Sequence, residues 1–234
     1  MDLGEFKVVT AEPDFYIVNK PAGIGFHDEN QGDESESTGF FNQCQRYFNE
    51  KLYPVHRLDK LTSGLVIMAR NQAAAKTFML MFEQKNVEKL YLALSNKKPK
   101  KKQGSIIGGM QKARSSKWML TKSNDNLAVS RFFSWGLQTN IPGLRLFLIK
   151  PETGKTHQIR VALKSIGSPI LGDTLYGGEA ADRGYLHAFA LRFEYSGNTF
   201  EFLQQPESGE LYSSSILQQV TDLDCGFDLN WPKR

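Results

Sequence analysis

The pattern of hydrophobic positions predicts many short strands and few helices. Alternating or continuous apolar runs are typical of strands, and apolar residues spaced by three and four are typical of helices. Strands are predicted at residues 6–10, 15–19, 65–69, 87–95, 128–138, 144–149, 185–195 and 199–203. Helices are predicted at residues 39–52, 72–85 and 157–166. Helices placed irregularly among many strands favour an α+β fold with a mixed sheet over a doubly wound βαβ repeat.

Polar residues at the predicted helix ends fit capping positions. Thr38, Asn71 and Thr156 are expected to cap the three helices, and Gly167 to end the last one. The first helix is expected to bury an aromatic-rich face of Phe40, Phe41, Cys44, Tyr47 and Phe48. The second is expected to bury Ala74, Ala75, Phe78, Met79 and Phe82. These faces indicate core packing more than ligand binding.

The strand predicted at residues 87–95 has two different faces. Leu90, Leu92 and Leu94 share one face with Glu88, whereas Tyr91 shares the other with Lys89. The aliphatic face is expected to pack inward. Tyr91 is therefore expected on the more polar face, either as a half-buried strand aromatic or as part of a site.

Charge is distributed unevenly along a chain of net charge +4. Residues 97–122 contain nine Lys or Arg and no acid, and residues 201–228 contain six acids and no base. Residues 28–36 carry five more acids and read as a surface loop. The basic segment predicts a hairpin that attracts an anionic partner, nucleic acid first, or a hairpin that is only solvated.

The 234-residue length predicts one large domain or two closely packed halves. The preferred interpretation is a single domain at residues 1–234, with its core at about 6–205 and an acidic tail at 206–234. No apolar run approaches the roughly 18 residues that a membrane span needs. The N-terminus lacks a signal-peptide pattern, and two cysteines are too few for a disulfide framework. These features predict a cytoplasmic protein with no membrane partner.

Residues 56–70, HRLDKLTSGLVIMAR, place His56, Arg57 and Asp59 on a short loop before a buried strand. Phosphate-loop, dinucleotide and nucleophile-elbow motifs are absent from the sequence, and the four histidines have no metal-ligand spacing. The remaining candidate is a carboxylate site at Asp59, beside Arg57. Such a carboxylate is a competent nucleophile when an arginine keeps it ionised, but a structural ion pair fits the residues equally well.

This stretch resembles the signature of the RluA family of RNA pseudouridine synthases. Further blocks resemble the family's other motifs in the family's order: NKPAG at 19–23, EKLYLAL at 88–94, TGKTHQIRVAL at 153–163, SPILGDTLYG at 168–177 and YLHAFAL at 185–191. The resemblance implies a mixed, mostly antiparallel sheet with an RNA-binding cleft across it. It also implies isomerisation of uridine to pseudouridine in ribosomal or transfer RNA, without a metal or cofactor.

The resemblance assigns roles to matching residues. Asp59 is the implied catalytic aspartate, and Arg160 is the basic residue expected to pair with it. Tyr91 is the tyrosine expected to stack on the base and to accept the proton from carbon five. Arg57 is expected to fill the gap left by the flipped nucleotide, because a base inside structured RNA must leave its stack first.

Further substrate-binding residues are expected around these four. They are His56, Lys20, Thr62, His157, Gln158 and Lys155. Lys155 stands where the family usually has arginine, so a bidentate contact there is not expected. The small N-terminal RNA-binding domain often fused in this family is not expected either.

Two other functions fit parts of the sequence. A non-catalytic RNA-binding or chaperone module could share the scaffold, although intact Asp59, Tyr91 and Arg160 disfavour it. A carboxylate glycosidase needs a second acid near Asp59, and Asp173 is the one candidate in the motif blocks. The preferred interpretation is a monomeric enzyme acting on RNA and not on DNA.

Overall fold

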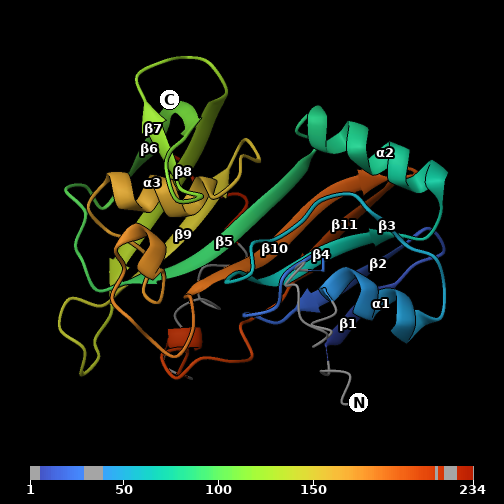
Figure 1. Ribbon diagram of the computed structural model, residues 1–234, viewed down its shortest axis with the longest axis horizontal. Coiled ribbons are helices and arrows are strands. Elements are labelled where there is room, and N and C mark those ends of the chain that lie inside the picture. Colours follow the sequence, from blue (N-terminus) through green and yellow to red (C-terminus); the bar gives the residue numbers. More distant parts are fainter. Residues whose placement is uncertain (1–5, 29–38, 214–215, 219–225, 234) are drawn as a thin grey trace.

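The computed structural model describes residues 6–28, 39–213, 216–218 and 226–233. Within these ranges the elements form one eleven-stranded sheet with helices packed against it (Figure 1). The strands are β1 (Lys7–Ala11), β2 (Phe15–Lys20), β3 (Tyr53–Pro54), β4 (Ser63–Ala69), β5 (Val87–Ser95), β6 (Gln103–Lys112), β7 (Trp118–Thr121), β8 (Leu127–Gly136), β9 (Arg145–Pro151), β10 (Leu186–Tyr195) and β11 (Asn198–Leu203). The helices are α1 (Phe40–Phe48), α2 (Gln72–Glu83), α3 (Gln158–Ser165) and the 3-10 helix η1 (Thr174–Tyr176).

The sheet is mixed and mostly antiparallel, as predicted. Its order is β1-β2-β4-β10-β5-β9-β8-β6-β7, with β11 added to β10 and β3 added to β4. The pairing of β4 with β10 is parallel, and the other pairings among the described residues are antiparallel. The α+β fold class is therefore confirmed.

Strands β4 and β10 meet over a very short distance. Only Ser63 with His187 and Gly64 with Ala188 are paired, after which β4 pairs with β3 and β10 with β11. Gly64 has a φ of +112°, and a Cβ there would lie 2.2 Å from the Ala188 carbonyl oxygen. A residue without a Cβ is needed for this approach. The junction fixes the start of β4, which directly follows the loop that carries Asp59.

Helix α2 packs on the sheet largely as the sequence predicts. Asn71 caps it by accepting a hydrogen bond from the Ala74 N–H at 2.8 Å. Phe78 is buried, but Met79 is 59% exposed and Met81 is buried in its place. The prediction for Met79 was wrong because at 100° per residue it points away from the stripe that runs through Phe78 and Met81.

Helix α1 is shorter than predicted. It buries Phe40 and Cys44, whereas Tyr47 is 58% exposed. The predicted cap, Thr38, lies outside the described residues. Asp28, from the acidic stretch, accepts hydrogen bonds from the Gly39 N–H and the Asn42 amide at 2.6 and 2.7 Å. This carboxylate therefore orders the start of the helix.

Helix α3 begins differently from the prediction. Its N-cap is His157, with a φ of +57°, and not Thr156. His157 makes no side-chain capping bond, and the Gln158 side chain instead accepts a hydrogen bond from the Lys155 N–H at 3.0 Å, in the turn before the helix. Gly167 follows the helix with a φ of +78°, as expected for a helix stop.

The basic segment forms the predicted hairpin, from β6 and β7, but this hairpin continues the main sheet instead of standing apart from it. Strand β6 lies within the sheet between β8 and β7, and Ile106 and Met110 are buried. Most of the segment's cations remain exposed. The strand alternation of residues 103–112 was hidden by the glycines of that stretch, which carry no hydrophobic signal.

The C-terminal segment contributes to the main core. Tyr212, Ile216, Phe227 and Trp231 are buried among side chains of β5, β8, β9 and α3. None of the helices in the described ranges is both long and apolar enough to cross a membrane.

Candidate functional site

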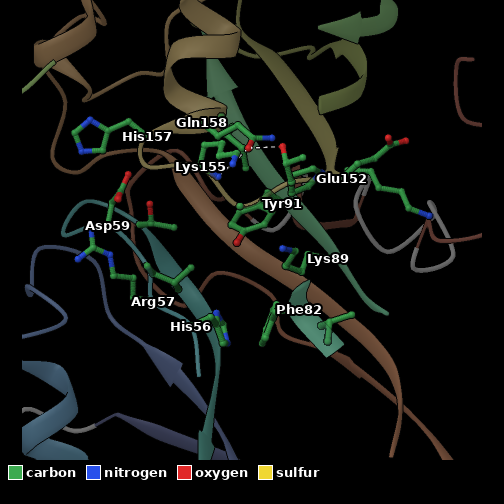
Figure 2. Close-up of a pocket in the computed structure, with 18 of the residues that line it drawn as sticks. His56, Arg57, Asp59, Phe82, Lys89, Tyr91, Glu152, Lys155, His157 and Gln158 are labelled. Atoms are coloured by element: carbon green, nitrogen blue, oxygen red, sulfur yellow. Dashed lines mark hydrogen bonds between the residues drawn. The ribbon is translucent and has the colours of Figure 1, made fainter. Parts of the chain in front are cut away.

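Two cavities meet at the loop before β4. The first has a volume of about 720 Å³ and the second about 770 Å³. Both are lined by Arg57, Asp59, His157 and Arg160. Nine sequence-predicted residues line the first cavity: His56, Arg57, Asp59, Thr62, Tyr91, Lys155, His157, Gln158 and Arg160. Figure 2 labels all of them except Thr62 and Arg160. The loop, β5 and α3 thus bring together residues far apart in the chain.

Arg160 is shared by two carboxylates. Its Nη1 lies 3.3 Å from an oxygen of Asp59, as the prediction of a pair requires. Its Nε and Nη2 donate to the two oxygens of Asp173, each at 2.8 Å. Asp173 is 2% exposed, so the stronger, bidentate pair is also the buried one.

Asp173 fixes the orientation of Arg160. Burial alone lowers the pKa of Arg160, but the hydrogen bonds and charge of Asp173, with the charge of Asp59, raise it overall. The guanidinium also lies over the Tyr176 ring at 5.0 Å. It therefore presents its Nη1 to the Asp59 carboxylate.

Tyr91 lies in the first cavity on β5, on the strand face predicted for it. Leu90, Leu92 and Leu94 on the opposite face are fully buried. Burial and the Asp59 charge raise the pKa of Tyr91. The hydroxyl is therefore protonated at neutral pH, and the ring offers a flat surface beside Asp59.

Arg57 is exposed where the two cavities join. Figure 2 shows its side chain close to Asp59, at the edge of the cavity. A guanidinium in this place can enter either cavity without breaking a hydrogen bond or ion pair of the described structure.

His56 has a defined tautomer. Its Nε2 accepts a hydrogen bond from the Ile67 N–H at 2.9 Å, so the ring proton is on Nδ1. Burial and the nearby charge of Lys89 lower the pKa of His56 to about 3. The ring is neutral at physiological pH and packs against Phe82 at 4.8 Å. It is suited to donate a hydrogen bond, not to exchange a proton.

His157 is connected to the basic segment. The Tyr176 hydroxyl accepts a hydrogen bond from the Trp118 N–H at 2.9 Å and lies 2.8 Å from His157 Nδ1. Because that hydroxyl can donate to Nδ1, the ring proton of His157 belongs on Nε2. Burial lowers the pKa of His157. Strand β7 is thus tied to the wall of the site.

Lys20 does not line either cavity. It is fully buried, and its Nζ donates to the carbonyls of Pro21 and Thr62, each at 2.9 Å. The carbonyls of Asp59 and Lys60 are each 3.5 Å away. Burial lowers its pKa to about 7. Lys20 therefore holds the Asp59 loop from beneath and has no path to a phosphate.

Gln158 is likewise occupied by the protein. Its amide oxygen accepts from Thr153 Oγ1 and the Lys155 N–H, and its nitrogen donates to the Val129 carbonyl and Ser130 Oγ. No donor remains for a substrate. Gln158 lines the first cavity, as predicted, but its hydrogen bonds are those of a residue that shapes the turn at 153–155.

Thr62 and Lys155 complete the predicted set. Thr62 is buried, and its carbonyl accepts from Lys20. Lys155 lines the first cavity. In the described ranges no three His, Cys, Asp or Glu side chains come together in a way that could hold a metal ion.

Comparison with known proteins identifies the family. The family model described as RNA pseudouridylate synthase matches residues 14–165, more than half of the chain. This chain belongs to the RNA pseudouridylate synthase family. The resemblance of its motifs to the RluA branch is confirmed.

Relatives in bacteria support the same family. An uncharacterized RNA pseudouridine synthase of Haemophilus influenzae is 46% identical over 92% of this chain and 95% of its own length. A ribosomal large subunit pseudouridine synthase C of Rickettsia bellii is 34% identical over 74% of this chain. The match covers 57% of that longer protein.

A solved structure supports the pseudouridine synthase fold. Human RNA pseudouridylate synthase domain containing 1 superposes with a TM-score of 0.75, at 24% identity and over 96% of each chain. At this identity the likeness speaks for the fold alone.

The sequence did not predict the place of two residues in the site, Asp173 and Lys89. Asp173 was noted only as a possible second acid, because nothing in its motif shows that it faces Arg160. Lys89 was placed on the strand face of Tyr91 but was not recognised as part of the cavity wall, where it lies. The alternation of β5 was the available signal, since residues two apart on a strand share a face.

Proposed function

We propose that this chain isomerises a uridine in RNA to pseudouridine, with Asp59 as the essential catalytic residue. The observation that supports this most is the position of Asp59, where two cavities meet and where Arg160 supplies the opposite charge at 3.3 Å. Family membership supports the reaction class. In this proposal Asp59 engages the target nucleotide while the glycosidic bond to nitrogen is exchanged for a bond to carbon five.

The surrounding residues fit steps of this reaction. Tyr91 offers its ring to the flipped uracil, and base–aromatic stacking contributes about 1–3 kcal/mol. Arg57 is placed to occupy the gap that the nucleotide leaves, because it is exposed at the cavity edge. Because the raised pKa of Tyr91 keeps its hydroxyl protonated at neutral pH, Tyr91 can accept the proton from carbon five only by passing its own proton to water in the cavity.

We propose ribosomal or transfer RNA as the substrate. The Rickettsia bellii relative is named for the large ribosomal subunit, which favours ribosomal RNA. The exposed cations of the basic segment fit a phosphate backbone. The proposal further takes the chain to be a single catalytic domain, monomeric and cytoplasmic, with no DNA or membrane partner.

The glycosidase alternative is weakened by Asp173. Its two oxygens are both committed to Arg160, and it is buried. A hydrolytic acid or base must be open to substrate or water. The remaining rival is a module that binds RNA without modifying it.

Release of tritium from RNA labelled at uridine carbon five tests the proposal. Total ribosomal and transfer RNA from cells lacking this protein would be incubated separately with the wild type and with Asp59→Asn. We expect release by the wild type from at least one pool and none by Asp59→Asn. RNA binding without release by the wild type would favour the non-catalytic module.

A further inference from the structure

Lys89 reaches across the first cavity. It projects from β5 on the face of Tyr91, and Figure 2 shows it between Tyr91 and the ring of Phe82. Its Nζ lies 5.3 Å from the centre of that ring. On the other side, a Cβ built on Gly154 would be 4.0 Å from Nζ, with no other atom nearer. The ammonium thus spans the space between the sheet and the turn at 153–155.

Two carboxylates in the wall of this cavity, Glu88 and Glu152, already have other partners. Glu88 accepts hydrogen bonds from Lys150 and from Arg192, the latter at 2.7 Å. Glu152 forms an ion pair with Arg131. Lys89 itself forms no hydrogen bond or ion pair with any of the described residues.

Among the residues that the structure describes, the Lys89 ammonium has no hydrogen-bond acceptor. Burial lowers the pKa of Lys89 to about 8, which leaves it mostly charged at neutral pH. A partly buried charge is costly unless a partner or ligand compensates it. Its ligand should therefore supply an oxygen with negative charge or strong acceptor character.

The surroundings of Lys89 fit a base more than a phosphate. Phe82 and the neutral His56 ring form one wall, and Tyr91 lies on the same face of β5. Lys89 and Tyr91 are two positions apart on this strand, so their backbones are about 6.6 Å apart. This distance is close to the width of a pyrimidine ring. A uracil stacked on Tyr91 would therefore bring a carbonyl oxygen to Lys89.

We propose that Lys89 donates to a carbonyl oxygen of the target uracil and stabilises the negative charge that develops there. This rests on the proposed function. If the bond from the ribose to nitrogen breaks first, its electron pair leaves with the base and spreads to both carbonyl oxygens. If Asp59 instead adds to carbon six, the electrons of the ring double bond move to the oxygen at carbon four. Lys89 keeps its protons in both routes, and the proton on carbon five leaves later.

The test compares Lys89→Met with the wild type in single-turnover tritium release at saturating enzyme. Removal of a donor that meets developing charge typically costs about 10²–10³ in rate. We expect a loss of this size, with an RNA Kd within about threefold of the wild type. Lys85→Met is the matched control, because it removes the same charge at the exposed rim of the same cavity. It should leave the single-turnover rate within about threefold.

Several outcomes would overturn the proposal. A rate for Lys89→Met within about threefold of the wild type would exclude a role in the reaction. A weaker Kd with a salt dependence shallower by about 0.7, at unchanged rate, would assign Lys89 to a phosphate. Thermal melting checks the fold, and Lys89→Gln carries the same comparison if the Met variant unfolds. Absence of release by the wild type would instead refute the proposed function.

Discussion

Asp59 and Asp173 bind unequal shares of the Arg160 guanidinium. The buried Asp173 takes two hydrogen bonds of 2.8 Å, and Asp59 takes one contact of 3.3 Å. The weaker contact suits Asp59 as a catalytic carboxylate, because a carboxylate that engages a substrate must loosen its bond to Arg160. A buried ion pair with Asp173 and the pair proposed for catalysis, with Asp59, thus share one arginine.

Asp173→Asn should damage both stability and activity. An amide cannot accept both hydrogen bonds in the same way, and breaking a buried pair costs about 3–5 kcal/mol. We expect the free energy of unfolding in urea to fall by this amount. A displaced Arg160 should slow single-turnover tritium release about 100-fold.

Asp125→Asn is the control for this prediction, since Asp125 lies in an exposed turn. Its unfolding free energy should stay within about 0.5 kcal/mol of the wild type. An Asp173→Asn variant that matched this control would show that Asp173 does not hold Arg160.

His187 should make the protein sensitive to acid. It is buried, with Nδ1 2.7 Å from Ser63 Oγ and Nε2 2.7 Å from the Gln204 carbonyl, and burial lowers its pKa to about 3. The unfolded chain, with an ordinary histidine pKa of about 6.5, binds more protons than the folded one between these values. The free energy of unfolding should therefore fall as the pH is lowered through this window.

Urea titrations from pH 7 to pH 4.5 measure this effect. His187→Gln should reduce the steepest slope of unfolding free energy against pH by up to about 1.4 kcal/mol per pH unit, which is the contribution of one proton. His27→Gln, at an exposed position, should keep the wild-type slope. Equal slopes for all three proteins would show that His187 is not the residue that takes up a proton on unfolding.

At the scale of single residues, the sequence indicated which side chains gather but not what they bond. Asp59, Tyr91 and Arg160 line one cavity, as expected for motifs that belong to the same family fold. Lys20 shows what was not predictable. Its motif indicated a ligand contact, but its ammonium lies beneath the loop and bonds to carbonyls, because the backbone of two neighbouring segments happens to converge there.

Among the elements, the contact of β4 with β10 positions the Asp59 loop. Gly64→Ala would place a methyl group 2.2 Å from the Ala188 carbonyl oxygen and strain a φ of +112°. Both effects together should cost about 3–5 kcal/mol of unfolding free energy. We expect tritium release to be lost with the register of the loop.

Gly23→Ala separates these two effects. Gly23 also has a positive φ, of +87°, but a Cβ there would meet nothing within 4 Å. It should cost only the conformational strain of about 1–2 kcal/mol. Equal losses for the two variants would mean that the close approach at Gly64 is unimportant.

Helix ends show where local signals suffice. Asn71 was predictable as a cap because its side chain reaches the N–H three residues on. Thr156 is not the N-cap of α3, because His157 turns the chain at the helix start with a φ of +57° and the Gln158 side chain holds the preceding turn through the Lys155 N–H. That arrangement depends on Thr153 and on β8, which local spacing cannot show.

Over the whole molecule, the sheet order and the contacts of the C-terminal segment could not be predicted. The sequence showed strands, but the neighbours of each strand depend on long-range pairing, such as β10 between β4 and β5. The segment after residue 205 lacks a clear pattern, although Trp231 and Phe227 are buried in the main core. Single buried aromatics have no periodicity to detect.

The basic segment should determine how RNA affinity depends on salt. Replacing Lys100, Lys101 and Lys102 by Gln removes three exposed charges. If each contacts one phosphate of a single strand, the slope of log Kd against log salt should fall by up to about 2. Replacing the exposed Lys51 and Lys76 should leave the slope unchanged, and equal slopes for both sets would contradict a special role of the segment.

The account depends above all on the role of Asp59. The most direct measurement is single-turnover tritium release by the wild type and Asp59→Asn on the same labelled RNA, with Kd determined for both. We predict release by the wild type alone and Kd values within about threefold of each other. Release by Asp59→Asn at a rate near that of the wild type would contradict the assignment of Asp59 as the catalytic residue.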